Sequence, residues 1–214
     1  MKYKTIKNFK NKLQNSDNNE FVDLLFDFIK EEGKTNYDES VTQLQHSLQT
    51  ASLARTEDGR RHIVIASLLH DIGHLLIDEN DSKNDFLKKD LNHENIASNF
   101  LKDFFSEEIT ESIRLHVVAK RYLCSIDNSY YESLSKASKN SFKVQGGALN
   151  KEEINELENN KYFKDAVRLR KWDDRGKVSL KEVEELDTYK EMIVAERLAT
   201  VSYTHLTLPT TLVV

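Results

Sequence analysis

The chain is almost free of proline and poor in glycine, and this shortage limits its possible folds more than any other feature. It has one proline and six glycines in 214 residues. The turns that join β-strands draw heavily on both residues, so the shortage favours long helices joined by polar loops. We therefore predict an all-α fold. The one proline, Pro209, falls in a final segment whose composition differs from that of the rest.

We expect one domain over residues 19–200, preceded by a polar N-terminal extension at residues 1–18. A length of 214 residues suits one domain with a real core. The final segment, residues 201–214, has no Lys, Arg, Asp or Glu and is rich in Thr and Leu. It resembles translated read-through of sequencing-adapter DNA, so we expect it not to be native.

Charge and cysteine content exclude several classes of protein. Lys and Arg number 31 against 36 Asp and Glu, and a net charge of −5 is small and of the wrong sign for binding nucleic acid. Cys124 is the one cysteine, which excludes an intrachain disulfide and fits a reducing compartment. The N-terminus lacks the apolar stretch of a secretory signal, and the longest apolar run, residues 63–69, is far short of the roughly 20 residues of a membrane span. We expect a soluble cytoplasmic protein without membrane or nucleic-acid partners.

Apolar residues recur with a helical period along most of the chain. Gly33 is a stop signal for the first helix, Asn92 is a candidate N-cap, and Asn150 with Glu153 resembles a capping box. The polar stretch 78–85 is predicted to be a loop. Helices are predicted at residues 19–32, from 41 to a turn at 58–59, and at 63–76, 92–105, 107–123, 151–158, 162–173 and 186–199.

Six of the seven histidines lie between positions 46 and 116. Four of them, His46, His70, His93 and His116, are separated by 24, 23 and 23 residues. In an antiparallel bundle this spacing is about one helix plus one loop, so successive helices can bring their histidines to a shared core. One histidine on an apolar face is more commonly a hydrogen-bonded core residue, but four at this spacing favour a common site.

The strongest local motif is the run from Leu68 to His74, which contains His70 and Asp71 side by side. Neighbouring side chains on a helix diverge by about 100°, so both can serve one metal cluster only where the helix edge faces it. This favours a dinuclear site. His74 lies one turn after His70 and is predicted to be a further ligand or a substrate contact, with a surface histidine as the alternative.

The pattern of His46, the His70-Asp71 pair and Asp173 resembles the H…HD…D signature of the HD-domain superfamily, an all-α fold that binds divalent metals. Imidazole and carboxylate ligands suit iron, manganese or zinc. By itself the signature would favour a phosphohydrolase. Asp174 is the neighbouring alternative for the last ligand, and Asp173 is preferred because it follows Trp172, as in the family. The resemblance implies six metal ligands, with Asp71 bridging two ions: His46, His70, Asp71, His93, His116 and Asp173.

The stretches around these ligands resemble the HD-type phosphonate oxygenases, from about residue 20 to about residue 190. These are mixed-valent di-iron enzymes that break the C–P bond of 2-amino-1-hydroxyethylphosphonate, and a sister activity takes the trimethylammonio analogue. The resemblance implies an HD-domain helical bundle, two iron ions (Fe2+/Fe3+) and dioxygen as co-substrate. It is carried by four blocks: residues 37–51, residues 116–123, residues 134–138 with 145–147, and residues 170–177.

The same resemblance implies contacts to the phosphonate from His74, Lys120, Ser138 and Arg170. Their chemistry is independently suitable, because cationic and hydroxyl donors are what bind a group with up to two negative charges. Lys120 lies one turn after His116, so one helix face would present both a metal ligand and an anion-binding group.

At the opposite end of the substrate, the resemblance assigns Glu39 to the cationic amine. Tyr37 corresponds to a mobile tyrosine that fills the vacant iron site before substrate arrives. As a catalytic set, the resemblance therefore gives His74, Lys120 and Tyr37. Glu39 could equally be an acidic residue favoured in the first turn of a helix, and a carboxylate attracts primary and quaternary ammonium groups alike.

The expected activity is oxidative cleavage of a small organophosphonate, with release of phosphate and either glycine or glycine betaine. Two other classes remain open on the sequence. A metal-dependent phosphohydrolase could use the same ligands to activate water for attack on a phosphate ester or nucleotide. A signalling or metal-storage module could keep the fold without turnover. The residues do not choose between the amino and the trimethylammonio substrate.

Overall fold

The computed structural model describes residues 6–37, 41–77 and 92–198, and within these ranges the chain is helical without a strand. One isolated bridge joins Asn36 to Thr42. This confirms the predicted all-α fold. The predicted loop at 78–85, the final segment 201–214 and Glu39 lie outside the described residues.

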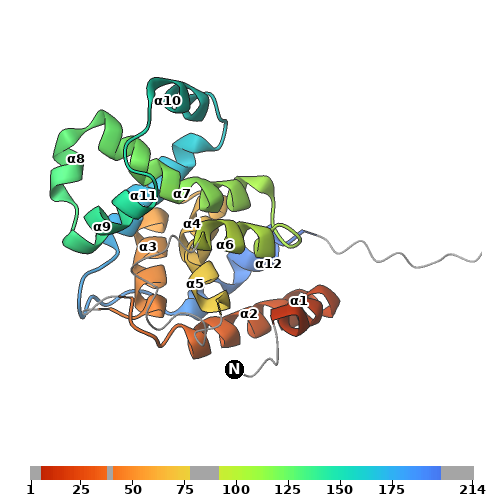
Figure 1. Ribbon diagram of the computed structural model, residues 1–214. Helices are drawn as coiled ribbons and strands as arrows, with labels where there is room; N and C mark the ends of the chain where they lie inside the picture. Colours follow the sequence, from red (N-terminus) through yellow and green to blue (C-terminus); the bar gives the residue numbers. More distant parts are fainter. Residues whose placement is uncertain (1–5, 38–40, 78–91, 199–214) are drawn as a thin grey trace, which may run out of the picture.

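The helices form a bundle in which α3, α4, α7 and α11 lie at the centre (Figure 1). The most extensive packing is between α7 and α11, and α7 also packs against α6 and α4. No helix of the described residues is long and apolar enough to cross a membrane. The elements are α1 Ile6–Asn15, α2 Asn18–Glu32, α3 Gln43–Glu57, α4 Arg61–Leu69, α5 Ile72–Leu76, α6 His93–Leu101, α7 Glu107–Ile126, α8 Asn128–Ser133, α9 Lys136–Val144, α10 Lys151–Glu158, α11 Phe163–Arg175, a 3₁₀ turn Leu186–Tyr189, and α12 Lys190–Glu196.

The helix predicted over residues 63–76 is broken in the structure. All residues of α4 from Ile63 to Leu69 are buried, and α5 begins only at Ile72. Between them Asp71 has φ −99° and ψ 8°, outside the helical range, and its carbonyl accepts a hydrogen bond from the His74 amide at 2.9 Å. The prediction of one helix was therefore wrong, because the apolar pattern continues across a turn that changes the direction of the adjacent side chains.

Two short helices, α8 and α9, were not predicted because each has few apolar residues and, unlike α10, no capping box was recognised at its start. Conversely, α6 is shorter than predicted. It follows Asn92, which has a left-handed backbone with φ 49° and makes no side-chain cap hydrogen bond. The capping box of Asn150 and Glu153 is confirmed, and α10 has the predicted bounds.

Helix α1 packs into the domain core, although the sequence analysis set residues 1–18 apart as a polar extension. Phe9 and Leu13 are fully buried within the main hydrophobic cluster. The Phe9 ring stacks on Phe28 with centroids 4.5 Å apart and on Phe100 at 5.8 Å. Residues 6–15 therefore form part of the packed domain.

This packing predicts that Phe9→Ala destabilises the protein by about 3–5 kcal/mol, the usual cost of removing a buried Phe ring. Urea unfolding of the full chain would measure the loss as a lower midpoint at unchanged slope. Ile6→Ala on the same helix is the control, because Ile6 is 38% exposed. Equal, small effects of the two variants would contradict the assignment of α1 to the core.

Candidate metal centre

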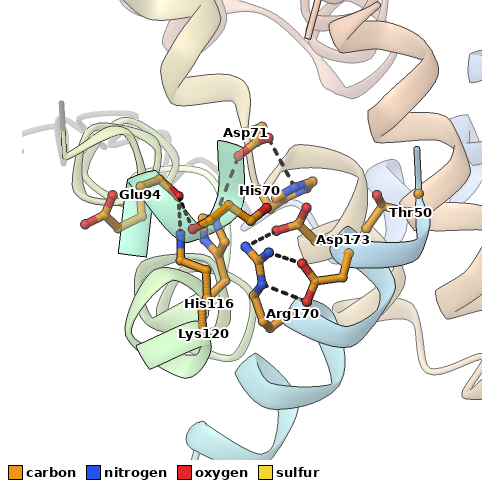
Figure 2. Close-up of polar contacts among 12 residues, drawn as sticks. Thr50, His70, Asp71, Glu94, His116, Lys120, Arg170 and Asp173 are labelled. Atoms are coloured by element: carbon orange, nitrogen blue, oxygen red, sulfur yellow. Dashed lines mark hydrogen bonds and ion pairs between the residues drawn. The ribbon is translucent and has the colours of Figure 1, made fainter. Parts of the chain in front are cut away.

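The structure brings the six predicted ligands together from five parts of the chain. His46 comes from α3, and His70 with Asp71 from the break between α4 and α5. His93 begins α6, His116 lies in α7 and Asp173 in α11. All six are buried in the centre of the bundle. Figure 2 shows Asp71 between His70 and His116, with Asp173 on the neighbouring helix.

Main-chain carbonyls determine which ring nitrogen is free in three of the four histidines. A carbonyl oxygen only accepts hydrogen bonds, so each Nδ1 that lies against one must carry the proton. In a neutral ring, Nε2 then has an unshared lone pair. The three contacts are His46 Nδ1 to the Gly176 carbonyl at 2.9 Å, His70 Nδ1 to the Ser67 carbonyl at 2.9 Å, and His116 Nδ1 to the Ile113 carbonyl at 2.7 Å.

The Nε2 atoms point toward one another in two pairs. Those of His46 and His70 are 3.2 Å apart, and those of His93 and His116 are 3.3 Å apart. Two lone pairs at this distance repel unless a proton or a metal ion lies between them. A proton or a metal ion at each pair removes this repulsion, although in the second pair a main-chain contact fixes the lone pair of His116 alone.

Asp71 lies between the two pairs and offers one oxygen to each. Its Oδ2 is 3.5 Å from His46 Nε2 and 3.3 Å from His70 Nε2. Its Oδ1 is 3.3 Å from His93 Nε2 and 3.7 Å from His116 Nε2. A carboxylate in this position can bridge two metal ions, which is the role expected from the sequence.

Asp173 completes the group around His46 and His70. Its Oδ1 is 3.3 Å from His46 Nε2 and accepts no hydrogen bond from the described residues. The Lys177 ammonium lies 3.4 Å from this oxygen and offsets part of its charge, and the oxygen also lies where it could bind a metal ion. Within the described residues, three groups could hold a metal: His46, His70 and Asp173; His70, Asp71 and His116; Asp71, His74 and His93.

The pKa values of the cluster reflect the same demand for positive charge. Burial alone would lower the pKa of His46, but the carboxylates of Asp173 and Asp71 outweigh it and raise the pKa to about 9. Burial likewise opposes ionisation of Asp71, but the imidazoles of His70 and His46 hold its pKa well below the usual value. The carboxylates are thus ionised at neutral pH and available to a metal.

His74 lies at the edge of the cluster, where it could serve as a ligand or contact a substrate. Its ring stacks on that of His93 with centroids 4.0 Å apart, and its Nε2 is 3.9 Å from Asp71 Oδ1. Burial, together with the neighbouring His93, lowers the pKa of His74 to about 3. It is therefore a neutral donor or acceptor at physiological pH.

Tyr37 covers the opposite side of the cluster. Its ring stacks on His46 with centroids 3.9 Å apart, and the ammonium group of Lys177 lies 5.2 Å from the centre of the ring. Burial and the charge of Asp173 raise the pKa of the phenol, so it stays protonated. The partner predicted for the far end of the substrate, Glu39, lies outside the described residues.

The predicted anion-binding residues lie beside the metal cluster on α7, α9 and α11. Lys120 is buried, and its Nζ donates to the Ser141 hydroxyl at 2.7 Å. Ser138, the predicted contact, lies one turn earlier on α9, and its hydroxyl accepts from Ser135 at 3.1 Å. Burial, together with the charge of Arg170, lowers the pKa of Lys120 to about 7.

Two glycines allow the close approaches on which this geometry depends. A Cβ on Gly73 would lie 2.0 Å from the His93 carbonyl oxygen, so only glycine lets α5 abut the start of α6. A Cβ on Gly176 would lie 2.5 Å from the Thr50 hydroxyl. Because the Gly176 carbonyl orients His46, both glycines help to position histidines of the candidate metal cluster.

Sequence reasoning missed Ser141, Lys177 and Tyr130, which lie within or beside the site. Lys177 Nζ is 3.4 Å from Asp173 Oδ1, one turn along the chain. The Tyr130 hydroxyl donates to Asp174. A helical spacing of three or four residues from predicted site residues could have indicated Ser141 and Lys177. No comparable signal pointed to Tyr130, because it is 40 residues from its partner Arg170.

Comparison with known proteins adds a family to this geometry. The HD domain family matches residues 44–158. The chain is 47% identical over 170 residues to a hydroxymethylphosphonate dioxygenase of Gimesia maris, covering 79% of this chain and 85% of the relative. It is 38% identical over 159 residues to a [1-hydroxy-2-(trimethylamino)ethyl]phosphonate dioxygenase (glycine-betaine-forming) of Leisingera caerulea, covering 74% and 79%. It is also 34% identical over 175 residues to an uncharacterised protein, L432, of Acanthamoeba polyphaga mimivirus, covering 81% and 80%.

The paired geometry predicts that His93→Ala lowers the bound metal by one of two ions per chain, because only one Nε2 pair loses a member. Metal analysis of desalted protein would measure the ratio. His62→Ala is the control, since His62 Nε2 pairs with Asp165 at 3.2 Å, away from the cluster. Full metal content in His93→Ala would contradict the assignment of this histidine to one metal position.

Proposed function

Because this chain belongs to the phosphonate oxygenases of the HD-domain family, we propose that it is a di-iron oxygenase. It breaks the C–P bond of a small 1-hydroxyphosphonate with dioxygen and releases phosphate. Support comes from the two phosphonate dioxygenases among its relatives and from the His and Asp cluster. The same support favours an oxygenase over a hydrolase.

The observation that carries the proposal is the bridging position of Asp71 between two pairs of opposed Nε2 atoms. Each pair can offer the Nε2 atoms of two histidines and one carboxylate oxygen. Neutral imidazoles with carboxylates are a ligand set that iron accepts. The proposed ligands of two iron ions are His46, His70, Asp71, His93, His116 and Asp173.

The residues beside the cluster would bind the phosphonate and set its direction. Lys120 and Arg170 supply positive charge, and Ser141 and Ser138 supply hydroxyl groups on α9. His74 is neutral and can donate one hydrogen bond from the edge of the cluster. With the phosphonate held here, the carbon that bears the hydroxyl group would face the metal cluster.

The overall reaction balances with one dioxygen and no other reactant. A 1-hydroxyphosphonate plus O2 gives a carboxylate, phosphate and a proton, so the C–P bond and one C–H bond break while both oxygen atoms enter the products. When bound, the iron would supply the activation of dioxygen that protein side chains cannot provide. Tyr37, stacked on His46, would shield this side of the cluster from solvent.

Three substituents on the carbon that bears the hydroxyl group are candidates. Two were expected from the sequence, an aminomethyl or a trimethylammoniomethyl group, with glycine or glycine betaine as product. The relative from Gimesia maris is named for hydroxymethylphosphonate, which carries neither group. A competition assay with the three hydroxyphosphonates would rank them by kcat/KM.

The proposal predicts that iron-loaded protein releases phosphate from a 1-hydroxyphosphonate only when dioxygen is present. Phosphate and oxygen consumption would be measured together, and we expect a ratio of about one from the balance above. The matched control is the same protein under argon. Equal phosphate release without oxygen would instead indicate a phosphohydrolase.

Phosphonate binding should weaken as the pH rises through about 7, because the Lys120 ammonium loses its proton there. The lowered pKa means that the charge is present below this value and lost above it. Titration with methylphosphonate from about pH 6 to about pH 9 would measure the affinity. Lys120→Met should bind more weakly at low pH and retain only the change that comes from ionisation of the phosphonate. Parallel pH curves for the two proteins would contradict the role of Lys120.

A further inference from the structure

A network of side chains from α8 and α11 holds the guanidinium group of Arg170. Its NH1 donates to Asp173 Oδ2 at 2.6 Å. Its Nε donates to Asp174 Oδ2 at 3.2 Å and lies 3.3 Å from the Tyr130 hydroxyl, while NH2 bonds to Asp174 Oδ1. The guanidinium therefore has a metal-site carboxylate at one end and Asp174 along one edge, as Figure 2 shows for Arg170 and Asp173.

The donor count of Arg170 leaves room for an anion. A guanidinium has five N–H groups. The contacts above engage Nε–H and one N–H on each terminal nitrogen. One N–H remains on NH1 and one on NH2, and both can donate to phosphonate oxygens.

The Asp174 carboxylate accepts hydrogen bonds within this network and lies outside the candidate metal cluster. Oδ1 accepts from Arg170, and Oδ2 accepts from both Arg170 and the Tyr130 hydroxyl, the latter at 2.5 Å. The three candidate metal groups among the described residues do not include it. This supports Asp173 over Asp174 as the metal ligand. The contacts of Asp174 are instead with the guanidinium group of Arg170.

Tyr130 reaches this network from α8, at the start of residues 128–144, which we call the α8–α9 arm. Neither helix of the arm has a buried residue, and the buried apolar residue of the arm is Leu134 between them, so polar contacts contribute to holding the arm. The same arm carries Ser138 and Ser141, and Ser141 accepts from Lys120. The Tyr130 hydroxyl thus connects the arm that bears the serines with α11, the helix that bears Arg170. Figure 1 shows α8 and α9 at the outer edge of the bundle.

We propose that Tyr130 and Asp174 are positioning residues that hold the Arg170 guanidinium, with its two free N–H groups, ready for the phosphonate. The proposal rests on the phosphonate chemistry of the proposed function. Asp174 fixes the plane of the guanidinium, and Tyr130 fixes Asp174 while fastening the arm to α11. Neither residue contacts the reacting carbon, so their effect acts through substrate binding.

The test is the affinity of iron-loaded protein for methylphosphonate, measured by calorimetry without turnover. Tyr130→Phe removes the hydroxyl and keeps the ring, and we expect binding to weaken about tenfold, as for loss of one hydrogen bond to a charged group. Asp174→Asn should weaken it at least as much. In turnover, KM should rise more than kcat falls. Iron content and the melting temperature should stay at wild-type values.

Tyr131→Phe is the matched control, because it removes the hydroxyl of the next residue and keeps the ring that contacts Phe142 and Lys139. Tyr130→Phe and Asp174→Asn binding methylphosphonate as tightly as Tyr131→Phe would overturn the proposal and leave the proposed function standing. Weaker binding accompanied by loss of iron or a lower melting temperature would also overturn it, in favour of a purely structural role. A wild-type protein that binds no phosphonate would contradict the proposed function, and this inference with it.

Discussion

The structure depends on one constraint: histidine nitrogens that face each other in pairs, and a carboxylate between the pairs, are buried together and need cations beside them. Main-chain carbonyls keep a proton of His46, His70 and His116 on Nδ1, so in the neutral rings the Nε2 atoms can only accept. Asp71 adds negative charge between the two pairs, where burial makes uncompensated charge costly. Metal ions resolve this conflict, and the bundle is arranged so that five segments deliver their ligands to the same point.

Several local features of the chain serve this arrangement. The break between α4 and α5 lets His70 and Asp71 face one cluster, although neighbouring side chains on a continuous helix would diverge. Gly73 permits contact between α5 and the start of α6, which places His93. Arg170 also donates to Asp173, so in the proposed function one side chain would link the charge balance of the metal cluster to recognition of the phosphonate.

Much of the fold and of the candidate site could be predicted from the sequence, and the predictions that failed did so for physical reasons. The shortage of proline and glycine indicated the all-α fold, and the histidine spacing with the HD signature indicated the six residues that meet in the core. The helix break was missed because the apolar pattern runs through it without interruption. Helices α8 and α9 were missed because each is short and has few apolar residues, none of them buried, and Tyr130 was missed with them. Contacts between distant polar residues leave no periodic signal, so only the folded chain reveals them.

The central claim is that two iron ions lie on opposite sides of the Asp71 carboxylate. Anomalous diffraction at the iron absorption edge from crystals of the iron-loaded protein tests it most directly. The account predicts two peaks, one beside the Nε2 atoms of His46 and His70 and the other beside those of His93 and His116. A single peak, or iron bound away from Asp71, would contradict it.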